Sequence, residues 1–257
     1  MSIARQRYPA PGRGQPRCAR FGFVSARPQP TAKGEVAVEE LSRGGRTVAR
    51  RVAEAKATVP EHTLWVEVDM EACAALRERG KAQTAGAGAS APTYADMVVR
   101  ACAVALREHP RANGAHRDGH LEAYGRVNVG LAVHGPGALT VPTVFDADQR
   151  SLAEIAATTR ALVERVAQGA VTSSELSGAT FTVSSVDVRG FTAILTPPQA
   201  GVLACGAVEP RAVVHEGELA ARRRMDLTLT CDHRILFGVD AAAFLGQVRE
   251  LLERAAL

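Results

Sequence analysis

The chain has 257 residues, of which 46% are hydrophobic and 23% are charged, and its mean hydropathy is −0.03. This composition is typical of a soluble globular protein with one large domain and a sizeable core. The sequence holds no run of about 18 apolar residues and no apolar segment at its N-terminus, so we expect neither a membrane span nor secretion.

The formal net charge of +4 comes from residues 1–34, a segment rich in Pro, Gly and Arg. This segment holds seven of the 31 basic residues and no acidic residue, so residues 35–257 carry 24 basic and 27 acidic side chains. Its low helical periodicity predicts a linker-like arm, in which Cys18–Ser25 is a candidate short strand. Binding of the arm to nucleic acid or to a partner protein is the weaker alternative, because no binding motif accompanies the charge. We expect no nucleic-acid partner.

The five cysteines are odd in number and scattered, and none forms a C-x-x-C pair. Neither a disulfide framework nor a zinc knuckle is indicated, and a reducing cytoplasm fits best. Cys231 stands two residues before His233 and has two interpretations, a nucleophile or a packed thiol. We favour the packed thiol, because residues i and i+2 of a strand share a face without necessarily touching.

Helical periodicity dominates the first part of the chain after the arm. The predicted elements are a helix from Glu39 that ends before Pro60, a strand at His62–Asp69, a helix at Met70–Lys81, a loop at Ala82–Pro92 and a helix at Tyr94–Glu108. His109, His116 and His120 follow, and the last two have a helical metal-ligand spacing. Asn113-Gly114 and Asp118-Gly119 favour a solvated turn region over a metal site, and we expect no metal.

Strands dominate the rest of the chain, without regular alternation of strands and helices. The predicted strands are Val127–Val133, Leu139–Val144, Thr180–Ser184, Val202–Ala207, Ala212–His215 and Met225–Asp232, and the first two are joined by a hairpin turn at residues 134–137. Ser151 opens a predicted helix whose apolar side faces the core, and Asp240–Arg254 is the last helix. The predicted class is α+β, a mixed β-sheet flanked by helices.

His233 is the first candidate for chemistry. An alternating run from Met225 predicts a strand that presents this imidazole between Asp232 and Arg234, before Gly238 and the last helix. Histidine can take and return a proton near neutral pH, and a strand end is a rigid place from which to aim it. Asp232 and Arg234 point to the other face of a strand, so we expect them to orient the loop through ion pairs.

The sequence resembles the catalytic domain of the 2-oxoacid dehydrogenase (dihydrolipoamide) acyltransferases, whose fold is related to chloramphenicol acetyltransferase. The resemblance covers residues 36–257 in one unbroken order. It is carried by Asp232-His233-Arg234 with Gly238, Thr180-Phe181-Thr182-Val183-Ser184-Ser185, Pro197-Pro198-Gln199-Ala200, Arg126-Val127-Asn128-Val129-Gly130-Leu131-Ala132-Val133, Val141-Pro142 and Ala147-Asp148-Gln149-Arg150-Ser151-Leu152.

The resemblance implies an arm at residues 1–34 and an acyltransferase catalytic domain at residues 35–257. It implies transfer of an acyl group between coenzyme A and a thiol on a separate lipoyl or carrier protein. His233 is then the general base, and the Ser184 hydroxyl donates to the oxyanion of the tetrahedral intermediate. In the family the domain is a trimer whose sites lie between subunits, so a homotrimer or an assembly of trimers is expected. Asn128 is expected to tie strands together as a buried polar residue, and contact with the pantetheine arm is the weaker alternative.

One position departs from the family pattern His-x-x-x-Asp-Gly, because Phe237 stands where the Asp belongs. We expect this aromatic side chain to be buried and to pack the loop apolarly, so that an Asp restored there would be buried without a partner. Two alternatives to the acyltransferase hypothesis stay open. One is an acyltransferase of specialised metabolism with a non-lipoyl acceptor, and the other is a catalytically weak trimeric scaffold.

Overall fold

The computed structural model describes residues 32, 34, 40–84, 91–135 and 138–257. The predicted arm and its candidate strand at Cys18–Ser25 lie almost entirely outside these residues, as does much of the predicted loop at 82–92. None of the described helices is long and apolar enough to cross a membrane.

The core of the molecule is an eight-stranded mixed sheet in the order β1-β10-β8-β7-β4-β5, with β6 paired to β4 and β9 paired to β10. The contacts of β7 with β4 and with β8 are parallel, whereas β10 pairs antiparallel with β1, β8 and β9. The strands of this sheet are β1 (Glu61–Asp69), β4 (Val129–Gly135), β5 (Ala138–Thr140), β6 (Thr143–Val144), β7 (Phe181–Ser185), β8 (Gly201–Cys205), β9 (Glu209–His215) and β10 (Glu218–Asp232).

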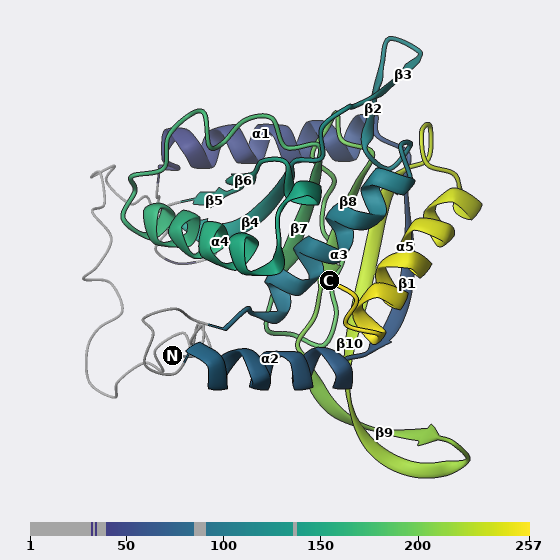
Figure 1. The fold of residues 1–257 in the computed structure, drawn as a ribbon. Coiled ribbons are helices and arrows are strands. Elements are labelled where there is room, and N and C mark those ends of the chain that lie inside the picture. The colour runs from purple at the N-terminus through teal and green to yellow at the C-terminus, as the bar shows by residue number, and fades with distance from the viewer. Residues whose placement is uncertain (1–31, 33, 35–39, 85–90, 136–137) are drawn as a thin grey trace.

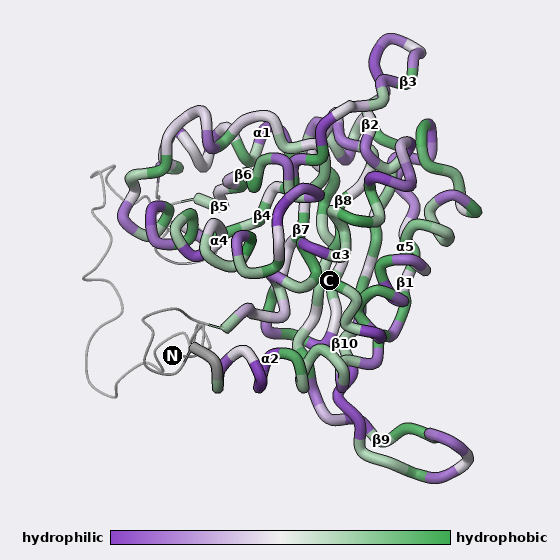
Figure 2. The backbone as a smooth tube through the Cα atoms, in the orientation of Figure 1, coloured by the Kyte–Doolittle hydropathy of each residue, from purple (hydrophilic) through white to green (hydrophobic). Residues whose placement is uncertain are grey.

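Helices cover one face of this sheet in Figure 1, where α3, α4 and α5 lie in front of the strands. The helices are α1 (Arg43–Thr58), α2 (Glu71–Thr84), α3 (Tyr94–Glu108), α4 (Leu152–Ala167) and α5 (Gly238–Glu253), with a short 3-10 turn at Ala147–Gln149. In Figure 2 the covering helices alternate between hydrophobic and hydrophilic segments, as expected of helices with one buried side. The predicted α+β class with a mixed sheet is therefore confirmed.

Two capping boxes fix where the covering helices begin. Thr93 accepts a hydrogen bond from the backbone of Asp96 at the start of α3, and Ser151 accepts one from Glu154 at the start of α4. In both boxes the acidic side chain accepts from the backbone N–H of the cap residue, so two otherwise unpaired donors are satisfied. The core beneath is closed by aromatic packing, with the ring centroids of Phe181 and Phe244 5.4 Å apart.

Three sequence-based predictions are wrong in detail. The predicted turn region after His109 contains a separate hairpin, β2 (Gly114–Arg117) and β3 (His120–Ala123), because Asp118 and Gly119 both adopt positive φ angles that suit a two-residue hairpin turn. The predicted strand at Leu139–Val144 is two short strands separated by Val141-Pro142, where proline cannot donate a ladder hydrogen bond. The predicted strand from Met225 begins seven residues earlier, at Glu218.

Candidate active site

His233 lies in the turn between β10 and α5, with its side chain exposed. Its backbone N–H donates a hydrogen bond to the carbonyl of Pro60 at 3.0 Å, which ties the turn to the residue before β1. The turn is closed by the backbone N–H groups of Ile235 and Leu236, which both donate to the carbonyl of Asp232 at 3.0 Å. The imidazole is therefore exposed to solvent, while hydrogen bonds fix the backbone of the turn that carries it.

The neighbours of His233 form the predicted ion pair. The Arg234 side chain donates to both carboxylate oxygens of Asp232, from Nε at 2.9 Å and from Nη2 at 2.6 Å. Asp232 is 2% exposed, whereas Arg234 is exposed. A buried carboxylate needs such a partner, and a two-pronged pair also fixes geometry. The expected ion pair is confirmed, and its role in orienting the loop stays a prediction.

Two aromatic rings pack edge-on against the His233 imidazole. The ring centroid of His62, on β1, lies 4.6 Å away with an interplanar angle of 84°, and the ring centroid of Phe237 lies 5.7 Å away at 71°. The guanidinium of Arg111 lies 5.7 Å from the centre of the Phe237 ring and its Nη1 donates to the carbonyl of Ile235 at 3.4 Å. His62 and Arg111 were not predicted from the sequence, since their proximity depends on the pairing of β1 with β10 and on where α3 ends.

Phe237 is 47% exposed in the single chain, so the expectation of a buried ring is wrong. The reason is its position as the N-cap of α5, where the chain leaves the sheet and the side chain makes no capping hydrogen bond. Val239, on the first turn of α5, is 84% exposed. The surface beside His233 thus has an apolar part, which is bordered by the cationic side chain of Arg111.

Ser184 lies on β7 and is half-buried. It is in register with Ala204 of β8, which is in register with Thr228 of β10. Thr228 precedes His233 by five residues, which correspond to about 16 Å of strand, and two strand spacings add roughly 10 Å sideways. The structure therefore does not bring Ser184 to His233 within one chain, and the two residues lie on the order of 15–20 Å apart.

Cys231 is fully buried and faces the core, where burial raises the pKa of its thiol to about 12. A thiol that stays protonated near neutral pH is a poor nucleophile. The interpretation of Cys231 as a packed thiol is confirmed. Asn128 also has its expected role, because its side chain donates to the carbonyl of Gly178 at 2.9 Å and accepts from the backbone N–H of Asp146 at 3.0 Å.

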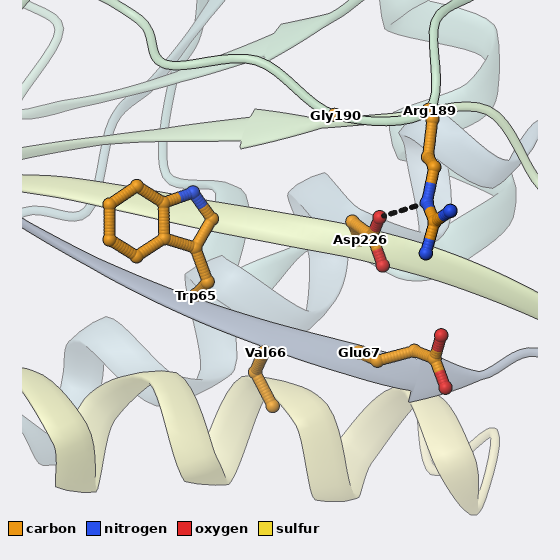
Figure 3. Close-up of a pocket in the computed structure, with 6 residues that line it drawn as sticks. All are labelled: Trp65, Val66, Glu67, Arg189, Gly190 and Asp226. Carbon is orange, nitrogen blue, oxygen red and sulfur yellow. Dashed lines mark hydrogen bonds and ion pairs between the residues drawn. The ribbon is translucent and has the colours of Figure 1, made fainter.

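A separate groove of about 560 Å³ lies at the middle of β1 and β10 (Figure 3). It is lined by Trp65, Val66, Glu67, Arg189, Gly190 and Asp226. Figure 3 shows the Val66 side chain pointing toward the helix, away from the Arg189–Asp226 pair. Both carboxylates of the groove pair with Arg211, Glu67 at 2.8 Å and Asp226 at 2.6 Å. Neither His233 nor Ser184 lines this groove.

The described part of the chain contains no group of three or more His, Cys, Asp or Glu side chains arranged to hold a metal ion. Among the three histidines that suggested a metal site, His109 instead shares a hydrogen bond of 2.8 Å with the side chain of Gln247. His116 and His120 lie on opposite strands of the β2–β3 hairpin. The helical spacing that the sequence suggested for them therefore does not occur.

A family model described as "2-oxoacid dehydrogenases acyltransferase (catalytic domain)" matches residues 33–257. The dihydrolipoyllysine-residue acetyltransferase component of the mitochondrial pyruvate dehydrogenase complex of Caenorhabditis elegans is 33% identical, over 83% of this chain and 44% of that protein. The succinyltransferase component of the 2-oxoglutarate dehydrogenase complex of Bartonella vinsonii subsp. berkhoffii is 39% identical, over 81% of this chain and 51% of that protein. The chain thus spans about half the length of the curated relatives it matches.

Solved structures give the same relationship. The dihydrolipoamide acetyltransferase of Azotobacter vinelandii superposes with a TM-score of 0.83 at 28% identity, over 90% of this chain and 97% of that chain. Its crystallographic description concerns the catalytic roles of a serine, a histidine and an asparagine that follows the histidine by four residues. The cubic core of a pyruvate dehydrogenase multienzyme complex matches equally well, with a TM-score of 0.83 and the same coverage. Chloramphenicol acetyltransferase, at 16% identity and a TM-score of 0.50 over 79% of this chain and 94% of that chain, shares the fold.

Proposed function

Because the chain belongs to the 2-oxoacid dehydrogenases acyltransferase family, we propose that it transfers an acyl group between coenzyme A and a thiol acceptor, with His233 as the general base. The observation that carries the proposal is the exposed imidazole of His233, held by a hydrogen-bonded turn at the end of β10 and flanked by the Asp232–Arg234 pair. A base for acyl transfer has to be reachable by substrate and fixed in direction, and His233 meets both requirements.

The proposed reaction needs one proton transfer in each direction. The imidazole of His233 removes the proton of the attacking thiol, and the thiolate forms a bond to the thioester carbonyl carbon. The Ser184 hydroxyl donates a hydrogen bond to the oxyanion of the tetrahedral intermediate. When the intermediate collapses, the original carbon–sulfur bond breaks. The departing thiolate then accepts the proton that His233 took from the attacking thiol.

Ser184 and His233 would meet between neighbouring copies of the chain. A separation on the order of 15–20 Å within one chain is too large for one substrate carbonyl to contact both residues. A closed threefold assembly, in which each chain supplies the histidine to one site and the serine to the next, resolves the separation. The match to a cubic core supports further assembly of such trimers.

A lipoyl group or a carrier-protein thiol, on a separate protein, is the proposed acceptor. The names of the relatives, which are dihydrolipoyllysine-residue acyltransferases, support the lipoyl group. One observation favours a different acceptor, namely that Phe237 occupies the position of the asparagine in the Azotobacter enzyme and makes the surface beside His233 apolar. A cytoplasmic location is also proposed, and the four free, buried cysteines of the described residues are compatible with it.

The proposal is tested by incubating the protein with a panel of acyl-CoA thioesters and free dihydrolipoamide, followed by mass detection of the acylated thiol. We expect His233→Ala to lower kcat by about 10²- to 10⁴-fold, because this is the usual contribution of a general base. Thermal unfolding and assembly should stay unchanged, since the exposed side chain holds no structural hydrogen bond in the described structure. His215→Ala, an exposed histidine on the far β9–β10 hairpin, is the matched control. Activity above half of the parent value in His233→Ala would exclude His233 as the base.

A further inference from the structure

We propose that His62 is a positioning residue for His233, which fixes the plane of the reactive imidazole through edge-on ring contact. The inference rests on the proposed acyl transfer, in which His233 acts as base. It starts from the short distance of 4.6 Å between the two ring centroids and from their nearly perpendicular planes, at 84°. Edge-to-face packing at such distances is directional, so it restricts ring rotation in a way that a shapeless apolar contact does not.

The hydrogen bonding of His62 does not explain why a histidine stands here. Both of its ring nitrogens are buried and lack a well-formed hydrogen bond in the described structure. Burial and His233 lower the pKa of His62, and they outweigh a weak contact with the backbone of Cys231, which raises it. Buried polar atoms are usually paired, and leaving one unpaired is unfavourable. A histidine at this site therefore carries an energetic penalty, and the defined contact of its ring in the described structure is the edge-on packing against His233.

The backbone fixes where the His62 ring lies. In the antiparallel pairing of β1 with β10, His62 is in register with Cys231, two residues before His233. The hydrogen bond from the His233 N–H to the Pro60 carbonyl binds the turn to the segment that carries His62. The Phe237 ring is also edge-on but lies farther away, at 5.7 Å, so His62 is the nearer aromatic neighbour of the His233 imidazole.

His62 is suited to this task because it remains uncharged. Burial lowers its pKa below the ordinary value of 6.5, and repulsion from His233 lowers it further. A neutral neighbour does not oppose the positive charge that His233 acquires when it takes the thiol proton. No hydrogen bond joins the two rings in the described structure, so His62 orients His233 and does not relay its proton.

The test compares His62→Ala, which removes the ring, with His62→Phe, which keeps a planar edge, and uses His215→Ala as the control. Steady-state kinetics with an acyl-CoA and free dihydrolipoamide give kcat and KM, and crystal structures of the variants give the plane of the His233 ring. We expect His62→Ala to lower kcat by about 10- to 100-fold with KM within about twofold, and His62→Phe to recover most of kcat. The His233 ring should keep its plane in His62→Phe and leave it in His62→Ala.

Parental kcat and an unchanged His233 ring plane in His62→Ala would overturn the inference, as would a His62→Phe variant as impaired as His62→Ala. If His62→Ala does not fold, His62→Leu replaces it, because leucine fills the volume without a planar ring edge. We expect His62→Leu to show the lowered kcat and the changed His233 ring plane predicted for His62→Ala. Absence of acyl transfer in the parent protein would instead count against the proposed function, and the ring plane alone would then decide the role of His62.

Discussion

Phe237 is the residue at which this chain departs from its family beside the proposed base. The sequence alone predicts that an Asp restored there would be buried and unpaired, but the ring is 47% exposed and the Arg111 guanidinium lies 5.7 Å from its centre. A carboxylate at this position would be partly solvated and would face a cation. A carboxylate could thus pair with Arg111 here without burying an isolated charge.

We therefore expect Phe237→Asp to change the free energy of unfolding by no more than about 1 kcal/mol, the usual range of an exposed ion pair. Turnover should be at least that of the parent, because a paired carboxylate would support the His233 turn. Urea unfolding and acyl-transfer kinetics measure the two quantities. In an Arg111→Ala background, Phe237→Asp should no longer support the His233 turn, because its cationic partner is gone. A double-mutant cycle that shows no coupling energy between positions 111 and 237 would contradict the pairing.

His62 also makes stability depend on pH. Burial holds its folded-state pKa below the ordinary 6.5. Well above that value the residue is neutral in both states and contributes nothing to the pH dependence. As the pH falls below 6.5, the unfolded chain takes up the proton more readily than the folded chain, so stability is lost.

His62→Phe should therefore lose less stability than the parent protein between about pH 7 and about pH 5. The measurement is the free energy of urea unfolding at several pH values in that window, with His215→Ala as a control for the loss of an exposed histidine. Parallel curves for the parent and His62→Phe would show that His62 is not held neutral by the fold.

Strand β8 ends against the segment that follows β7, and Gly206 makes this close approach possible. The backbone N–H of Ala207 donates to the carbonyl of Val188 at 2.7 Å. A Cβ added at Gly206 would lie 2.0 Å from the carbonyl oxygen of Arg189 and 2.9 Å from that of Val188. Because both atoms belong to the backbone, the segment would have to move.

Gly206→Ala should destabilise the fold by about 1–3 kcal/mol, as other overpacking substitutions do. The matched control is Gly246→Ala on the exposed side of α5, where the added Cβ meets no atom within 4 Å. That change should stabilise the helix by about 1 kcal/mol, because alanine loses less backbone entropy than glycine. Urea unfolding of both variants gives the comparison, and equal midpoints would contradict the predicted clash.

Local sequence patterns were sufficient to predict most helices and strands, but not which of them pair or pack together. The apolar periodicity predicted α3 at Tyr94–Glu108, and Ser151 was predicted to open α4, as the structure shows. The extension of β10 back to Glu218 was missed because the segment is rich in charged residues, which pair with β9 and with acidic groups on β1.

In the candidate site, too, single residues were easier to predict than contacts between distant segments. His233 was predictable from its motif, whereas the contact with His62 depends on strand register between residues more than 160 positions apart. Phe237 was misjudged because burial of a single side chain depends on where the chain leaves the sheet.

The separation of Ser184 from His233 within one chain leads to a prediction about the proposed trimer. His233→Ala and Ser184→Ala proteins should each be impaired alone, and removal of the oxyanion donor should cost about 10²- to 10³-fold. A mixed trimer contains one junction where an intact histidine meets an intact serine, so it should recover up to about a third of the parental activity. The measurement is acyl transfer by co-expressed mixtures whose trimers are verified by mass. Verified mixed trimers no more active than either parent would place both residues in one subunit, or show that the trimer arrangement is wrong.

That separation has a further consequence for the newly made chain. In the proposed assembly, an unassembled subunit holds the base of one site and the oxyanion donor of another. Single chains would then be inactive, and activity would arise only when subunits associate. Folded chains that have not yet found their neighbours would therefore leave thioesters intact.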